Sequence, residues 1–426
     1  MLKKLKASLN GFTSQPRDNY HGPKGHVLYA GLFFAAVILQ VVAVLALLVA
    51  GYFVAAPETR YPLLFLLVPL WIIVAALALL LVNFTSLAVY AYHGYRQSLQ
   101  RERRELWAGR WAGVLLNEEA LPVAPLPAEG TEALLDLKEA SFGEEAEMLA
   151  SLSSYYAVEP ALLRELNAPG LDTRLRALEA LAKLRSASTL MPLLRMLEDP
   201  HPVIRLMAAR AAARTIAAMP AGERERAALT LAGRLELSDL PLNSLEEVLV
   251  LLGEGAEAAL ARALSGETAA GFLEVAVRVA GRLRLGALSE QVAEFVEGSY
   301  PLALRVAALR ALGGLGRLPQ RAQSAVKKAA EDEHAGVREE AVRAAASLPL
   351  GQAEAVLWAR LGDSAWEVRR AAAEALLTLG GGGKSALIRA TETHPDEATR
   401  RVAGQVLLDA GAIAPQHLWQ TPEEMA

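Results

Sequence analysis

The residues that could carry chemistry in this 426-residue chain are few and scattered. The chain has no Cys, which excludes disulfides, thiol nucleophiles and Cys-ligated zinc or iron–sulfur sites. Its seven histidines never occur as HExxH, as HxH or as His-Glu pairs, the spacings that bring metal ligands together. No GxSxG segment is present for serine acyl chemistry. We therefore predict no catalytic residue, no metal site and no cofactor, and expect that the protein is not an enzyme.

One glycine-rich segment, GGGGKS at 380–385, looks superficially like a phosphate-binding loop. That motif requires Gly at the position of Thr378 and a preceding strand, whereas the residues before Gly380 predict a helix. We interpret the segment as a turn between two helices. His201 and His334 precede predicted helices, where we expect them to act as caps.

The elements that must position any site recur with a period of 31 to 37 residues. The strongest copies have an Asp or His six residues before an Arg, an Ala three residues after that Arg, and often a Leu seven after it. Two weaker copies lack the Arg and centre on Leu242 and Leu273. The landmark position is occupied by Arg174, Arg205, Leu242, Leu273, Arg305, Arg338, Arg369 and Arg400. A fixed period of this length is typical of a helical solenoid, in which each unit is stabilised by its neighbours.

The repeated phrase resembles HEAT and HEAT-like repeats, including those of the phycobilisome-lyase type. Eight copies cover residues 155–411, so the resemblance implies an all-α solenoid of about eight repeats. Some HEAT-like proteins are di-iron hydroxylases whose metal is held by repeated His-Glu pairs, which this chain lacks. Others attach or detach bilin chromophores, which gives a lyase-like enzyme as a third hypothesis. We predict that the Asp and Arg rows form a ladder that joins neighbouring repeats.

Two uncharged runs, 27–56 and 61–92, are each long enough to cross a bilayer, which takes about 20 residues. They predict a transmembrane helical hairpin in front of the solenoid. Basic residues flank its outer ends, whereas the link between the runs offers only Arg60. The positive-inside rule then predicts a two-span protein of the bacterial inner membrane, with both termini and the solenoid in the cytoplasm.

The expected organisation follows from these features. Residues 1–26 form a basic N-terminus, 27–92 the hairpin, 93–130 a juxtamembrane helix and Pro-rich linker, 131–411 the solenoid with a capping helix over 131–153, and 412–426 a tail. Trp107 and Trp111 predict either an interfacial segment with aromatic anchors or a span that ends in a solvated helical turn. The prolines of 121–127 exclude a helix there.

Charge is distributed unevenly along the chain. Residues 1–112 carry 11 basic and 4 acidic side chains, and the remainder carries 32 basic and 43 acidic. We expect the basic collar to attract anionic lipid. We expect no nucleic acid partner, because the solenoid is acidic overall.

A polar row lies five residues after the landmark, half a turn from the buried stripe. Its members are Glu179, Arg210, Glu247, Arg278, Arg310, Arg343, Glu374 and Gln405. We predict that Arg210, Arg278, Arg310 and Arg343, with Arg282 one turn beyond Arg278, bind an acidic protein partner on an inner wall. A solvated helix face is the alternative.

The sequence thus predicts a membrane-anchored cytoplasmic scaffold or adaptor; the alternative is an accessory or regulatory subunit of a membrane enzyme such as a glycosyltransferase.

Overall fold

The computed structural model of this protein describes residues 62–116 and 118–413. Every regular element among these residues is helical, which confirms the predicted all-α class for this part of the chain. The chain divides into two compact units, residues 1–152 and 153–426.

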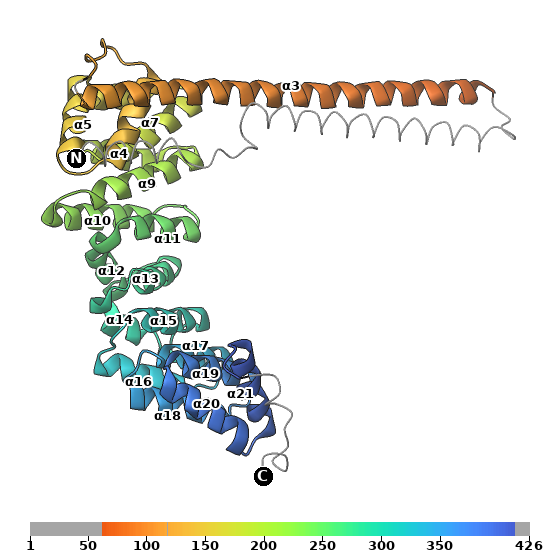
Figure 1. Cartoon of the computed structure of the whole chain (residues 1–426), viewed down its shortest axis with the longest axis vertical. Helices are drawn as coiled ribbons and strands as arrows, with labels where there is room; N and C mark the ends of the chain where they lie inside the picture. Colours follow the sequence, from red (N-terminus) through yellow and green to blue (C-terminus); the bar gives the residue numbers. More distant parts are fainter. Residues whose placement is uncertain (1–61, 117, 414–426) are drawn as a thin grey trace. The chain divides into compact units, whose positions relative to one another are not determined.

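The described part of the first unit centres on α3 (Pro62–Leu115), a single helix of 54 residues. The shorter α4 (Ala128–Ala140) packs against it (Figure 1). Trp111 of α3 is fully buried, and its Nε1 donates a hydrogen bond to the carbonyl of Gly130 at 2.9 Å. A Cβ at Gly130 would lie 3.1 Å from the ring of Trp107. Both interpretations of the two tryptophans are therefore wrong, because these rings form the contact between α3 and α4.

The predicted localisation requires a correction. Within the residues that the structure describes, no helix combines the length and the apolar character needed to cross a membrane. The uncharged run 61–92 does not form a helix of its own: it opens α3, which continues unbroken through Arg96 and Arg110 to Leu115. The other run, 27–56, lies outside the described residues, as do 1–26 and the tail beyond residue 413. The two-span inner-membrane assignment is therefore wrong on this structure.

The basic collar on α3 is partly neutralised by α4. Arg103 lies 3.3 Å from Glu129, and Arg104 forms an ion pair with Glu132. These two guanidiniums thus have carboxylate partners on α4, and the expected attraction of the collar to anionic lipid stays a prediction.

The connector between α3 and the solenoid is non-helical over 121–127, as the prolines predict. Two helices, α4 and α5 (Glu144–Tyr155), occupy the stretch for which the sequence predicted one capping helix. Gly143 separates them with a φ of +62°, a conformation that ends a right-handed helix.

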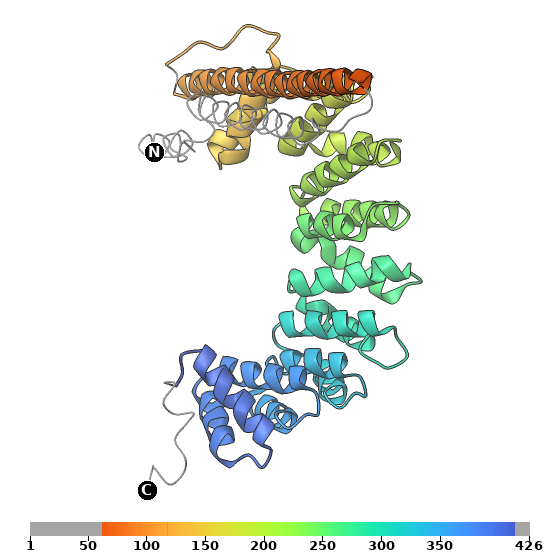
Figure 2. The ribbon, with the colours of Figure 1, turned by 90° about the vertical axis from the view of Figure 1, so that its right-hand side faces the viewer.

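The second unit is a stack of helix pairs (Figures 1 and 2). The second helix of each pair, here called the B helix, packs against the B helices of the neighbouring pairs. The B helices are α7 (Leu171–Leu184), α9 (Pro202–Ala217), α11 (Leu242–Leu251), α13 (Ala270–Arg282), α15 (Leu302–Gly314), α17 (Ala335–Ala345), α19 (Trp366–Thr378) and α21 (Glu397–Asp409). The A helices are α6 (Val158–Glu165), α8 (Leu190–Arg195), α10 (Ala221–Glu236), α12 (Ala256–Ser265), α14 (Ser289–Glu294), α16 (Gln320–Ala329), α18 (Leu350–Arg360) and α20 (Gly381–Thr393). One B helix falls on each predicted copy.

Small and branched residues of the repeat form the core of this stack. The Ala row three residues after the landmark is fully buried at Ala177, Ala208, Ala276, Ala308, Ala341, Ala372 and Ala403. The Leu row is equally buried at Leu181, Leu249, Leu312, Leu376 and Leu407. Gly253, Gly316, Gly380 and Gly411, each eleven residues after a landmark, have positive φ, the left-handed conformation that ends a helix. The predicted register is therefore confirmed.

Candidate functional site

The landmark arginines form a buried ladder that joins consecutive repeats. Arg338 of α17 donates from Nε and Nη2 to the two carboxylate oxygens of Asp363, at 2.9 and 2.8 Å. The Asp363 side chain is only 3% exposed, and it also accepts from the backbone N–H of Ala365 at the start of α19. Similar pairs with a buried or mostly buried carboxylate join Arg174 to Asp199 and Arg305 to Asp332. Arg205 pairs with Asp239, whose side chain is 73% exposed. The ladder predicted from the sequence is confirmed.

Four of the six landmark arginines also bind the turn before their own helix. Nη1 of Arg338 donates to the carbonyls of Asp332 and Glu333 at 2.8 and 3.0 Å. Arg205, Arg369 and Arg400 make the same pair of contacts five and six residues back. The landmark arginines are therefore structural, because each guanidinium binds the turn before its own helix, a carboxylate of the next repeat, or both.

The pKa values of the ladder carboxyls follow from this geometry. Burial raises the pKa of Asp363, but the hydrogen bonds from Arg338 and from the N–H of Ala365 outweigh it and hold the pKa below its ordinary value. Burial likewise opposes ionisation of Asp332, and hydrogen bonds from Arg305 and His334 bring its pKa below the ordinary value. Both carboxyls are therefore charged at neutral pH.

A second set of arginines lies on the opposite, accessible side of the B helices. Residues four apart form one line there, which we call the stripe: on α19 it runs through Trp366, Arg370 and Glu374. Arg370 lies 5.5 Å over the Trp366 ring and 2.7 Å from Glu374. Contacts of the same i,i+4 spacing link Glu274 to Arg278 on α13 and Glu339 to Arg343 on α17. The predicted polar row is the last position of this stripe.

The structure gives every predicted partner-binding arginine a glutamate. Arg210 contacts Glu247 at 2.6 Å, Arg278 contacts Glu246 at 3.0 Å and Glu274 at 2.7 Å, Arg282 contacts Glu246 at 3.4 Å, Arg310 contacts Glu340 at 2.5 Å, and Arg343 contacts Glu339 at 2.5 Å and Glu340 at 3.1 Å. Glu247 belongs to the predicted polar row, but Glu246, Glu274, Glu339 and Glu340 were not predicted from the sequence. Glu274 and Glu339 were detectable as i,i+4 partners, but Glu246 and Glu340 reach an arginine on a neighbouring helix.

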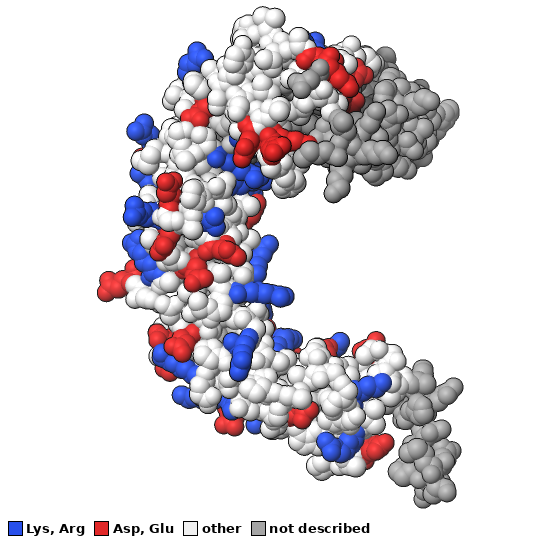
Figure 3. All heavy atoms as spheres, turned by 60° about the vertical axis from the view of Figure 1, so that its left-hand side comes forward, with Lys and Arg blue, Asp and Glu red and all other residues white. Residues whose placement is uncertain are grey.

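At Arg310, Arg343 and Arg282, the arginine side chain is nevertheless more exposed than the side chain of the glutamate that it contacts. The Arg310 and Arg343 side chains are 67% and 47% exposed, whereas the Glu340 side chain between them is 8% exposed. Arg282 is 60% exposed over Glu246 at 21%. An approaching molecule therefore meets guanidinium groups first. In Figure 3, Lys and Arg side chains project along one edge of the middle of the stack.

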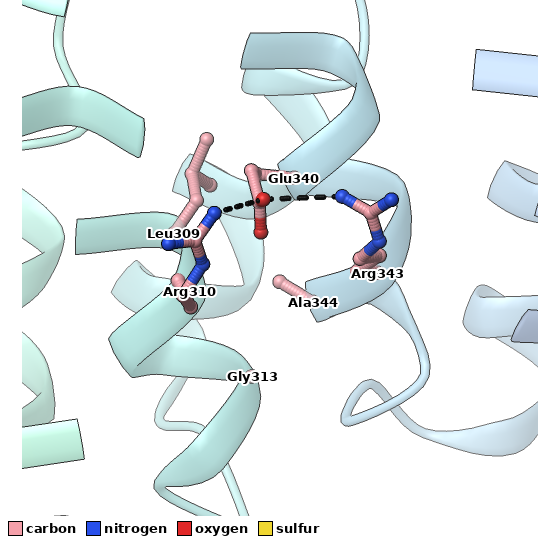
Figure 4. Close-up of a pocket in the computed structure, with 6 residues that line it drawn as sticks. All are labelled: Leu309, Arg310, Gly313, Glu340, Arg343 and Ala344. Atoms are coloured by element: carbon pink, nitrogen blue, oxygen red, sulfur yellow. Dashed lines mark hydrogen bonds and ion pairs between the residues drawn. The ribbon is translucent and has the colours of Figure 1, made fainter. Parts of the chain in front are cut away.

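Glu340 lies between two arginines of this surface and forms an ion pair with each of them (Figure 4). Arg310 reaches it from α15 and Arg343 from α17, and Gly313 and Ala344 line the same hollow of about 400 Å³. The hydrogen bond and the charge of Glu340 raise the pKa of Arg310 above its ordinary value. The shared carboxylate fixes the direction of both guanidiniums and leaves their remaining N–H groups to face outward.

The other candidate residues serve the fold. Gly380 has a φ of +82° between α19 and α20, and a Cβ at Gly383 would lie 1.9 Å from the carbonyl oxygen of Leu376. The GGGGKS segment is therefore the predicted inter-repeat turn, and it continues into α20. His201 and His334 do precede α9 and α17, but their side chains make no cap hydrogen bond. Asp199 and Asp332 accept the N–H groups of these two histidines instead.

Comparison with known proteins identifies repeats in part of this stack. The family model described as HEAT repeats matches residues 289–377, which extend from α14 into α19. The predicted resemblance is thus confirmed for these residues. No curated protein matches the chain.

Solved structures show only distant similarity. An engineered protein is 16% identical, with 72% of this chain and 99% of that chain covered and a TM-score of 0.30. Human deoxyhypusine hydroxylase in complex with glycerol is also 16% identical, with coverages of 74% and 99% and a TM-score of 0.24. Kap95p, from a structure with RanGDP, is 10% identical, with coverages of 98% and 56% and a TM-score of 0.44. None of these similarities is close enough to carry an argument about function.

Proposed function

We propose that this protein is a non-catalytic interaction scaffold that binds a protein partner on the stripes of α13, α15 and α17. Arg278, Arg310 and Arg343 form the centre of the surface, and Arg210 and Arg282 lie at its border. The observation that carries the proposal is the layering at Arg310, Arg343 and Arg282, whose side chains are more exposed than those of Glu340 and Glu246 beside them. Arg278 lies level with its glutamates, at 28% exposed against 21% for Glu246 and 30% for Glu274.

This layering favours carboxylate partners at short range. The glutamates balance the arginines in charge, so the row exerts little long-range attraction. At contact distance, an incoming carboxylate reaches the outer N–H groups before it meets the underlying glutamates, and charge-assisted hydrogen bonds of this kind are the stronger ones. We therefore expect the surface to select by fit and to change the dissociation rate more than the association rate.

A non-catalytic role agrees with the chemistry of the described residues. Among them, no three His, Asp or Glu side chains lie together as potential metal ligands. The charged groups of the B helices are engaged in ladder or stripe pairs rather than converging on a reaction centre. The two alternatives, an accessory subunit of a membrane enzyme and a lyase-like enzyme, gain no specific support from these residues.

The test is a triple substitution, Arg278→Gln with Arg310→Gln and Arg343→Gln, in the full chain. Gln is preferable to Glu, because a reversed charge would face Glu246 and Glu340 and would disturb the stack by repulsion. Partners that crosslink to the wild-type chain in its native cells are recovered and quantified from both forms. We expect recovery to fall at least tenfold, with the thermal unfolding midpoint nearly unchanged.

The matched control is Arg401→Gln, which removes an exposed stripe arginine paired with Glu397 on the last B helix. It should leave recovery unchanged. Equal recovery by the triple variant and the wild type would refute the proposal and leave the row as a solvated face.

A further inference from the structure

An apolar row runs parallel to the arginine row on α15 and α17 and continues onto α19, where the position in the arginine row is Glu374. It occupies the position three residues before the landmark, with Leu302 on α15, Ala335 on α17 and Trp366 on α19. Leu302 is 48% exposed and Trp366 is 50% exposed, so neither residue is part of the buried core. Val306, one turn after Leu302 on the stripe, is half-buried and extends the apolar surface.

The Trp366 ring is restrained by neighbouring side chains of its own helix. Arg370 lies over one face of its ring at 5.5 Å and is itself fixed by Glu374 at 2.7 Å. This stacking restrains the indole before any partner arrives, which lowers the entropy lost on binding. Exposed Trp and Arg are the residue types most enriched among energetically dominant interface residues.

The spacing of the two rows matches the width of a helix. Leu302 precedes Arg310 by eight residues, as Ala335 precedes Arg343, which is about 12 Å along a helix axis. An α-helix with its side chains is about 10–12 Å wide. One helix that crosses the B helices therefore contacts the apolar row with one edge and the arginine row with the other.

The extent of the apolar row sets the length of that helix. From α15 to α19 there are two steps between neighbouring B helices, each about 8–10 Å. This distance corresponds to about 11–13 helical residues, or three turns. The charge layering described above requires carboxylates on the edge that faces Arg310 and Arg343.

We propose that the surface docks an amphipathic helix of about three turns, apolar along one edge and rich in Asp or Glu along the other. This inference rests on the proposed function and specifies the chemistry of the partner. The occupant buries its apolar edge against Leu302, Ala335 and Trp366, while its carboxylates bind the outward N–H groups of the Glu340-centred arginines.

The test uses the full chain and labelled, end-capped 14-residue peptides in fluorescence anisotropy. The first peptide is a helix of Ala with Leu along one edge and Glu along the other. The second has Gln in place of Glu, and the third has Ser in place of Leu. We expect the first peptide to bind at least tenfold more tightly than either of the others.

The chain variant for the same assay is Leu302→Gln with Trp366→Gln, which should weaken binding of the first peptide at least tenfold. Its matched control is Leu237→Gln with Leu350→Gln, two exposed leucines, 89% and 58% exposed, that lie outside the B helices. The control should bind as the wild type does. Circular dichroism and thermal unfolding verify that both variants are folded.

Three outcomes overturn the inference: no binding of the first peptide, equal binding of all three peptides, or unchanged binding by the Leu302→Gln and Trp366→Gln variant. The proposed function fails on a different result, namely that the arginine triple variant recovers its native partner as the wild type does. If the arginine triple variant loses its native partner while the apolar pair variant keeps it, the scaffold role stands and only the amphipathic helix is refuted.

Discussion

Two rows of arginines on the same B helices differ in what surrounds them. The Arg338 side chain, on the landmark row of α17, is 12% exposed and is bound by a carboxylate that is 3% exposed. The Arg343 side chain, five residues later, is 47% exposed and shares Glu340 with Arg310. The first arginine holds two repeats together, and the second faces solvent from a fixed position.

The comparison shows that an ion pair is not by itself evidence of a structural role. Asp363 accepts the N–H of Ala365 just before α19 and joins two repeats, so its loss leaves the buried charge of Arg338 without a partner, which is strongly destabilising. An arginine that is half exposed remains hydrated when its glutamate is lost, and exposed pairs contribute little to stability. Exposure therefore separates arginines that maintain the stack from arginines that are available to a partner.

The largest expected effect tests the division between the buried and exposed faces of α19. Leu376→Asp places a charge among packed helices, where Leu376 is fully buried, and should cost about 4 kcal/mol or more. Glu374→Asp, two residues earlier on the stripe, should change stability by less than about 0.5 kcal/mol. Urea unfolding followed by circular dichroism measures both. Similar costs for the two changes would show that the face assignment is wrong.

A smaller effect separates the two kinds of carboxylate. Asp363→Asn should lower stability by about 3 kcal/mol, because it strands the buried Arg338. Glu340→Gln should cost about 1 kcal/mol, because Arg310 and Arg343 keep their contact with water. The urea midpoints of the two variants provide the comparison. A larger loss for Glu340→Gln would remove the distinction between the rows.

The ladder carboxyls contribute to the pH dependence of stability. The folded pKa values of Asp332 and Asp363 lie below their ordinary values, so the folded state favours the charged carboxylates. Their contribution is present above the unfolded pKa of about 3.9 and is lost as the pH falls through the folded values. The urea midpoint should therefore be flat from about pH 7 to 5 and fall below about pH 4.

The matched measurement is the same pH series on Asp363→Asn. Its decline at low pH should be shallower than that of the wild type, because one of the shifted carboxyls is gone. An identical decline would place the acid sensitivity outside the ladder.

Some parts of this picture follow from the sequence, and others need the packing of helices. A period of about thirty residues predicts the buried Ala and Leu rows and the landmark arginines, because every repeat requires the same contact with the next. The role of Glu340 could not be predicted in this way. Glu340 contacts Arg310 on another helix, and residue spacing does not give the offset between neighbouring helices. The i,i+4 pairs of the stripe could have been predicted from the sequence, whereas the sharing of Glu340 by Arg310 and Arg343 could not.

The first unit shows the limit of hydropathy. An uncharged run predicts apolar surroundings, but it does not specify what provides them or where the helix ends. Trp111 looked like an interfacial anchor because it follows such a run among arginines. Its ring is instead buried, and its N–H is satisfied by the carbonyl of Gly130, a contact that depends on the position of α4.

The most direct test of the account compares Arg338→Gln with Arg310→Gln in the full chain, each measured for urea stability and for binding of the Leu- and Glu-edged peptide. We predict that Arg338→Gln lowers stability by about 3 kcal/mol, whereas Arg310→Gln lowers it by less than about 1 kcal/mol. Under conditions where both are folded, only Arg310→Gln should weaken peptide binding, by fivefold or more. Equal losses of stability, or unchanged binding by Arg310→Gln, would contradict the division of the two arginine rows between stability and partner binding.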